Sequence, residues 1–85
     1  MHVEIARRAQ KFLKRLQKEQ RARIEKRLRQ LAQNPVPADA KFLGRDQQAE
    51  RVFRYRIGPF RALYKLKKEC VLVAKIDKRP RVYRR

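Results

Sequence analysis

The chain has few of the residues from which most enzyme sites are built. Its 85 residues include one cysteine, Cys70, one histidine, His2, and eight acidic residues. A lone cysteine forms no intramolecular disulfide, and a lone histidine gives a transition metal almost no ligands. Neither a Ser-His-Asp nor a Cys-His arrangement is available, and eight scattered carboxylates give little support to a paired-carboxylate site. We therefore expect no metal site, and Cys70 as a buried small hydrophobic residue.

Glycine and long apolar runs are also scarce. The two glycines, Gly44 and Gly58, are too few for a P-loop or a dinucleotide-binding motif, so we expect no nucleotide cofactor. No apolar run reaches 18 residues, which argues against a membrane-spanning helix. Residues 1–5 contain no apolar signal segment before the first charges. These absences predict a cytoplasmic protein that does not bind membranes.

Basic residues dominate what the chain does contain. Lysine and arginine number 26 against 8 aspartates and glutamates, so the formal net charge is +18 and the pI is about 11.4. The 42% hydrophobic content is enough for folding, and the 40% charged content then indicates a heavily charged surface. A chain of this length forms one small domain, residues 1–85, without a large enzyme cavity. The charge predicts a polyanionic partner, with nucleic acid as the leading candidate.

Changes in the spacing of apolar residues divide the first half of the chain into three elements. Apolar and polar residues alternate over residues 1–5, which predicts a short strand. Residues 9–16 carry apolar side chains at helical spacing, and the same spacing resumes over residues 24–31. Asn34-Pro35 ends the second helix, because proline disfavours the helical conformation of the residue before it. We expect a helical hairpin after the first strand.

The second half of the chain predicts a connection followed by strands. Residues 35–40 read as a loop, and we expect Phe42 and Leu43 to fasten this connection to the core. Three β-like runs follow, at 52–57, 60–66 and 70–76. The last run is apolar enough for a central strand. The element order predicts an α+β fold: an N-terminal strand, a helical hairpin, then a three-stranded antiparallel meander, forming one small sheet with the helices on one face.

Arginines alternate with apolar residues in the first two strands of this meander. Because successive side chains of a strand point to opposite faces, Arg54 and Arg56 share one face. Arg61 joins them if the hairpin register allows it. Tyr55 and Tyr64 fall in the apolar phase, so we expect them in the core. Guanidinium groups fixed on a pleated surface suit phosphate recognition.

Three sequence pieces of the hairpin and the tail carry a family resemblance. They are Tyr-Arg-Ile at 55–57, Phe-Arg-x-x-Tyr at 60–64 and Arg-x-x-Val-Tyr at 79–83. In this order and spacing, with an apolar strand before the third piece, they resemble the RelE/ParE superfamily of toxins from toxin-antitoxin systems. The element order is similar as well, so the resemblance covers essentially the whole chain. It implies the compact α+β fold of that superfamily.

The resemblance also implies a function. A RelE-like toxin enters the ribosomal A site and cuts messenger RNA without a metal or cofactor, and a cognate antitoxin protein silences it. In that family the 2′-hydroxyl of the message attacks the adjacent phosphate, and cationic side chains stabilise the developing charge. The arginines of this chain are compatible with such a mechanism, because preorganised guanidinium groups need neither a histidine nor a metal to stabilise the developing charge. The implied partners are the ribosome, the message and an antitoxin.

Site residues follow from the family motifs, position by position. Arg61 matches the hairpin arginine that would grip the scissile phosphate. Arg79, after the last strand, would stabilise the transition state or assist the leaving oxygen, and Tyr83 would orient the 2′-hydroxyl or stack on a base. Further RNA contacts are expected at Arg54, Arg56, Lys78 and Arg81. Members of the family carry lysines at the first two of these positions and often a histidine at the third, whereas an arginine stays protonated and is a poor general base.

Other interpretations of the same residues stay open at this point. Arg61 and Arg79 also fit ordinary solvated or ion-paired strand arginines. A ParE-like inhibitor of DNA gyrase would bind its target without any RNA chemistry. A nucleic-acid-binding module without catalysis would bind tightly, with a steep dependence on salt.

Overall fold

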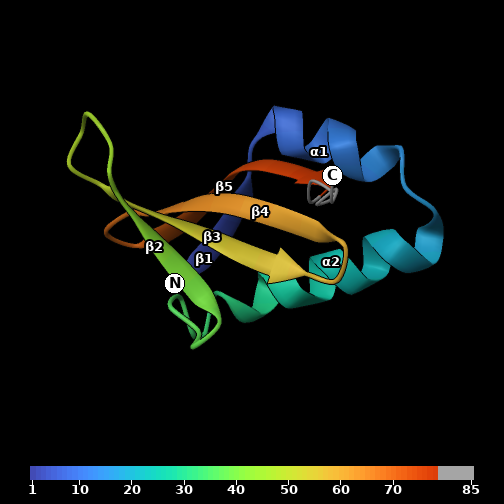
Figure 1. Ribbon diagram of the computed structural model, residues 1–85, viewed down its shortest axis with the longest axis horizontal. Helices are drawn as coiled ribbons and strands as arrows, with labels where there is room; N and C mark the ends of the chain where they lie inside the picture. Colours follow the sequence, from blue (N-terminus) through green and yellow to red (C-terminus); the bar gives the residue numbers. More distant parts are fainter. Residues whose placement is uncertain (79–85) are drawn as a thin grey trace, which may run out of the picture.

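The computed structural model describes residues 1–78. Its elements, in chain order, are β1 (His2–Ile5), α1 (Arg7–Lys14), α2 (Lys18–Gln30), β2 (Ala40–Arg45), β3 (Arg51–Ile57), β4 (Phe60–Leu66) and β5 (Cys70–Lys78). In this part of the chain the strands form one five-stranded sheet in the order β1-β5-β4-β3-β2. β1 runs parallel to β5, and the other neighbours are antiparallel. Figure 1 shows the twisted sheet, with β2 (green) on the left and both helices on the right. The predicted α+β fold is confirmed.

Both helices form because their apolar residues fall on one stripe. Ala9 and Leu13 of α1 are buried, as are Ile24 and Leu28 of α2, and each pair is four residues apart. Basic residues occupy the last turn of both helices, where they offset the negative end of the helix dipole. The two stripes join a single buried cluster with one face of the sheet. No helix within residues 1–78 is long and apolar enough to cross a membrane.

The helix-covered face of the sheet supplies most of the core. Its buried side chains are Phe53, Tyr55, Ile57, Phe60, Ala62, Tyr64, Val71, Val73 and Ile76. Tyr64 is fully buried, stacks on Phe53 with 5.3 Å between ring centroids, and donates its hydroxyl to the Pro35 carbonyl at 2.6 Å. Burial raises the pKa of Tyr64 to about 12, with smaller contributions from Tyr55 and Asp39. The predicted core placement of Tyr55 and Tyr64 is confirmed.

One prediction about the strands was wrong. The segment expected to fasten a loop to the core is the edge strand β2, so the antiparallel meander has four strands in the described residues. Phe42 and Leu43 are 51% and 45% exposed, although the Phe42 ring contacts Phe53 at 5.5 Å between centroids. Leu43 is the extra residue of a β-bulge, because Phe42 pairs with Phe53 while Gly44 already pairs with Val52. The bulge breaks the alternation by which a strand is recognised in a sequence.

Asp46 organises the loop between β2 and β3. Its Oδ1 accepts the backbone N–H groups of Gln48 and Glu50 at 3.0 and 2.9 Å. Its Oδ2 lies 2.7 Å from the ammonium nitrogen of Lys65 on β4. The hydrogen bond with Lys65, followed by the bond from the Glu50 backbone, lowers the pKa of Asp46, and the same carboxylate raises the pKa of Lys65. The loop is therefore held to the sheet face that the helices do not cover.

Candidate nucleic-acid interface

Strand alternation gathers charged side chains on the sheet face opposite the helices. The charged part of this open sheet face is a set of residues that neighbour one another in the register of β2 to β5, together with Leu63: Lys41, Arg54, Arg56, Arg61, Leu63, Lys65, Lys75 and Asp77. Arg56 stands directly opposite Arg61, and Arg61 directly opposite Asp77. The register condition on which the sequence argument depended is therefore met. Six cationic side chains and one carboxylate occupy neighbouring positions on this face.

Asp77 holds Arg61 on β4, the middle strand of the sheet, near the turn between β3 and β4. Its Nε donates to Asp77 Oδ1 at 2.8 Å, and the two side chains are 31% and 30% exposed. Lys75 lies 3.6 Å from the other carboxylate oxygen of Asp77. No hydrogen bond within residues 1–78 uses the Nη nitrogens of Arg61, so these donors are available to a phosphate. The carboxylate also offsets the repulsion between Arg61 and Arg56.

A shallow hollow lies beside Arg61, at the outer part of the open sheet face. It has a volume of about 360 Å³ and is lined by Asp39, Lys41, Arg54 and Arg56. Arg27, which lies on α2, supports this region: its Nη2 lies 3.2 Å from Asp39 Oδ2 and 3.4 Å from the backbone carbonyl of Arg56. Three cations around one hollow suit the backbone of a nucleic acid.

Arg27 is anchored in turn by the core. Its Nε donates to the Tyr55 hydroxyl at 3.0 Å, and its guanidinium carbon lies 4.8 Å from the centroid of the Tyr55 ring. A buried tyrosine thus fixes an arginine that contacts the Arg56 backbone. The sequence did not indicate this link, because Arg27 reads as one of many basic residues on a helix.

The structure places four of the seven predicted site residues. Arg54, Arg56 and Arg61 share the open sheet face, as predicted. Lys78 is exposed at the end of β5 and pairs with buried Phe60, so alternation puts it on the other face from Asp77. Three predicted residues lie outside the described part of the chain: Arg79, Arg81 and Tyr83.

A second β-bulge explains why sequence reasoning missed Asp77 and Lys75. Leu63 pairs with Lys75 while Tyr64 already pairs with Val73, so Ala74 is the extra residue. Without the bulge, alternation from Val73 would turn Lys75 and Asp77 toward the helices. The signal was present as a change of phase in the apolar pattern, from residues 71 and 73 to residue 76.

A basic groove runs between α1 and β5. It has a volume of about 520 Å³, and its lining combines five cations with two apolar side chains: Arg7, Arg8, Lys11, Arg15, Lys75, Phe12 and Ile76. The Phe12 ring meets the buried Phe60 ring edge-on at 5.9 Å between centroids. An apolar floor with a cationic rim suits an amphipathic acidic segment better than a bare polyanion.

Known structures share this fold. A chain of the archaeal RelE–RelB complex from Pyrococcus horikoshii is 24% identical, with a TM-score of 0.84 over 95% of this chain and 97% of that chain. A chain of the toxin–antitoxin complex RelBE2 from Mycobacterium tuberculosis is 26% identical, with a TM-score of 0.75 over 92% and 90%. The isolated E. coli RelE toxin is 22% identical, with a TM-score of 0.73 over 95% and 86%. No curated protein sequence matches the chain. The fold is that of the RelE-like toxins.

Sequence comparison then shows the family. The family described as the ParE toxin of type II toxin-antitoxin system, parDE, matches residues 3–83. The chain therefore belongs to this family of toxins, within the RelE/ParE superfamily that the sequence motifs predicted. Two of the similar structures above are complexes of a toxin with its antitoxin.

Proposed function

We propose that this toxin is a ribosome-dependent endoribonuclease that cleaves messenger RNA in the ribosomal A site of the cytoplasm and so inhibits translation. The observation that supports this most directly is Arg61, held by Asp77 on the open sheet face and directly opposite Arg56. When a 2′-hydroxyl attacks the adjacent phosphate, negative charge builds on the phosphate oxygens. A guanidinium already fixed in place stabilises that charge without reorganising during the reaction.

The proposed mechanism assigns a role to each site residue. Arg61 exchanges part of its contact with Asp77 for the scissile phosphate, and Asp77 keeps the guanidinium oriented while the message enters. Arg79 stabilises the transition state or the leaving oxygen, and Tyr83 orients the 2′-hydroxyl or stacks on a base. Arg54 and Arg56 contact the RNA from the open sheet face, Lys78 contacts it from the end of β5, and Arg81 supplies a further contact. Cleavage proceeds without a metal or other cofactor.

Electrostatic stabilisation is the main catalytic contribution in this proposal. Arg54 and Arg56 stay protonated at neutral pH and therefore bind the message instead of accepting its proton. Their places around the hollow of about 360 Å³ suit them to hold the RNA backbone next to the cleaved bond. Positioning the message and stabilising its charge then supply the rate enhancement.

A cognate antitoxin is the proposed protein partner. The groove between α1 and β5 offers an apolar floor of Phe12 and Ile76 under a rim of cations. An acidic amphipathic segment seated there would neutralise part of the net charge of +18, which otherwise attracts nucleic acid without selectivity. If purification from the native host at physiological salt yields nucleic acid but no small protein partner, this part of the proposal is wrong.

The test of the proposed activity is cleavage of messenger on translating ribosomes. Wild type is compared with Arg61→Ala and with Arg29→Ala, which removes the same charge from the exposed side of α2. We expect Arg61→Ala to slow cleavage by a factor of about 10²–10³, as loss of one oxyanion donor does, and Arg29→Ala to have little effect. Absence of cleavage by wild type, or equal rates in both variants, contradicts the proposal. Circular dichroism of each variant shows that it has folded.

Inhibition of DNA gyrase is a second candidate function, because the family that matches residues 3–83 is that of ParE toxins. A supercoiling assay separates the two candidates. Gyrase inhibition that survives Arg61→Ala, together with intact messenger, favours the ParE-like activity. Tight, salt-dependent RNA binding with neither effect indicates a nucleic-acid-binding module without catalysis.

A further inference from the structure

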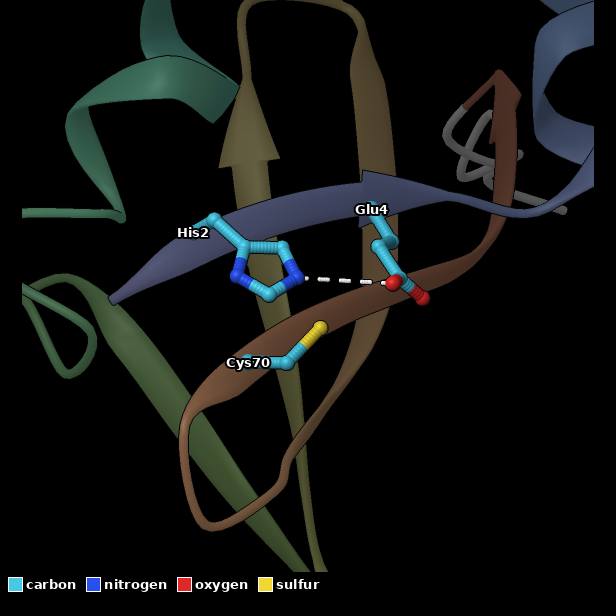
Figure 2. Close-up of side chains that lie close together, drawn as sticks. All are labelled: His2, Glu4 and Cys70. Carbon is cyan, nitrogen blue, oxygen red and sulfur yellow. Dashed lines mark hydrogen bonds and ion pairs between the residues drawn. The ribbon is translucent and has the colours of Figure 1, made fainter.

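Strands β1 and β5 bring the only histidine and the only cysteine of the chain together. β1 and β5 pair in parallel with His2 opposite Cys70, so both side chains lie on the same face of the sheet. Glu4 is two residues further along β1 and therefore shares that face. Figure 2 shows the three side chains converging from the two strands. A lone histidine and a lone cysteine were expected to hold no metal, but the parallel pairing of β1 with β5 brings them together.

The geometry of the cluster is close to that of a three-ligand metal site. His2 Nε2 lies 3.4 Å from Glu4 Oε2, and the nitrogen, oxygen and sulfur ligand atoms all lie within 4.8 Å of one another. Tetrahedral zinc at ordinary bond lengths holds such atoms about 3.3–3.6 Å apart. Small side-chain rotations therefore close the site, because parallel pairing already fixes the two backbones.

Electrostatics around the cluster permit a cation despite the charge of the whole chain. Lys67 interacts electrostatically with Cys70, but its Nζ lies 3.2 Å from Glu50 Oε2 and is therefore paired. Lys65, one strand further along the same face, is paired with Asp46 at 2.7 Å. Cys70 is partly buried, in the direction of the predicted burial. His2 and Glu4 are exposed, with side-chain exposures of 67% and 60%, so a metal has a path of entry and a face open to a fourth ligand.

We propose that His2, Glu4 and Cys70 form a binding site for a divalent metal ion of the zinc class, with a fourth position open to water. Imidazole nitrogen, carboxylate oxygen and thiolate sulfur are the donors that zinc takes in proteins. When the metal binds, the thiol releases its proton to solvent and the sulfur–metal bond forms. The ion joins the four-residue strand β1 to β5 across their side chains.

This site lies on the same sheet face as the candidate nucleic-acid interface, but far from Arg61. Cys70 begins β5, whereas Asp77, which holds Arg61, lies near its other end. Seven residues of extended strand separate them by roughly 23 Å. The proposal concerns the stability of β1 and does not depend on the endoribonuclease activity.

Cobalt(II) serves as the spectroscopic probe, because the composition of the chain makes its spectrum unambiguous. A thiolate-to-cobalt charge-transfer band can arise only from Cys70, since the chain has one cysteine. The full chain without an affinity tag, kept reduced by a phosphine, is titrated with cobalt and then with zinc. We expect the band to saturate at one cobalt per chain and to disappear when zinc displaces the cobalt.

Two matched variants test the ligand set. Glu4→Gln and Glu69→Gln remove the same charge near Cys70, but only Glu4 belongs to the cluster. We expect Glu4→Gln to weaken cobalt binding at least about tenfold, and Glu69→Gln to leave it nearly unchanged. Cys70→Ser abolishes the charge-transfer band, and in EDTA its Tm shows whether the variant has folded.

Thermal unfolding gives a second readout. At free zinc of about 100 times Kd, binding to the folded state alone raises the Tm of the wild type by at least about 10 °C. Cys70→Ser shows no such rise. A missing charge-transfer band, equal cobalt affinity in the two glutamine variants, or saturation at half a cobalt per chain, which means that two chains share the ion, overturns the proposal.

Discussion

Replacement of Tyr64 by phenylalanine tests the central packing of the molecule. The side chain is fully buried, and its hydroxyl donates to the Pro35 carbonyl at 2.6 Å, which fastens the segment after α2 to β4. Tyr64→Phe keeps the ring but leaves that half-buried carbonyl without its donor, at a cost of about 1 kcal/mol at neutral pH. In a domain of this size, such a loss lowers Tm by about 4–8 °C.

The same substitution has the opposite effect in alkali. Burial raises the pKa of Tyr64 from 10.0 to about 12, so the neutral phenol is favoured in the folded state. Its contribution to stability is therefore fully present below pH 10 and is lost as the pH rises toward 12, because the unfolded chain ionises first. The difference between the two pKa values corresponds to about 2.7 kcal/mol of unfolding free energy at most. Since this exceeds the hydrogen-bond loss, the phenylalanine variant becomes the more stable protein above about pH 11.

Urea unfolding of both proteins between pH 7 and pH 12, followed by circular dichroism, measures this reversal. Both proteins carry the same lysines, so the difference between their unfolding free energies at each pH cancels the lysine titration. A difference that stays constant over the whole range would refute the reasoning, because an exposed phenol has the same pKa in the folded and unfolded chains.

Three further predictions concern the core, the loop and the charged face. Leu28→Ala removes a fully buried side chain and lowers the unfolding free energy by about 2–5 kcal/mol, whereas Val36→Ala, at a position 44% exposed, changes it by less than about 0.5 kcal/mol; denaturant midpoints compare the two. The pKa of Asp46 is lowered below 3.8, so the stabilisation by its carboxylate is present above that pH and is lost as the pH falls through the lowered pKa. The difference in unfolding free energy between wild type and Asp46→Asn therefore shrinks in acid. A difference that persists at pH 2 contradicts this account. Asp77→Asn releases Arg61 and Lys75 from their shared carboxylate, so RNA binding tightens and the plot of log K against log salt steepens by about one; an unchanged slope means that neither cation meets phosphate.

The hairpin could be predicted from the sequence because its alternation is uninterrupted. Phe53, Tyr55 and Ile57 are buried and Arg54 and Arg56 are not, as strict period-two alternation requires. The two places where the predicted strand pattern failed each have an inserted residue. Leu43 hides the edge strand β2, and Ala74 reverses the faces of the second half of β5. A bulge changes the phase without changing the composition, so a single sequence reveals it only as an irregular apolar pattern.

The contacts between distant elements were beyond the reach of the sequence for a different reason. Arg27 and Tyr55 are 28 residues apart, and Arg61 and Asp77 are 16 apart. With 26 basic residues in the chain, nothing in the sequence distinguishes the arginine that meets a tyrosine or a carboxylate from the others. The parallel pairing of β1 with β5, which brings His2 to Cys70, is a property of the topology. Where alternation is unbroken, the local sequence pattern predicts which face a side chain occupies. The residue that it contacts on another strand depends on the order of the strands in the sheet.

The charge distribution of the open sheet face supports the proposal that this face binds a polyanion. Arg56 and Arg61 stand directly opposite each other on neighbouring strands, an arrangement of like charges that destabilises a sheet. Asp77 offsets this repulsion only in part, because one carboxylate, 30% exposed, faces both Arg61 and Lys75. Within residues 1–78 the core contains no buried charged side chain, so these arginines lie outside it. A bound phosphate backbone would remove the repulsion. Binding of a polyanion would therefore also stabilise the folded chain.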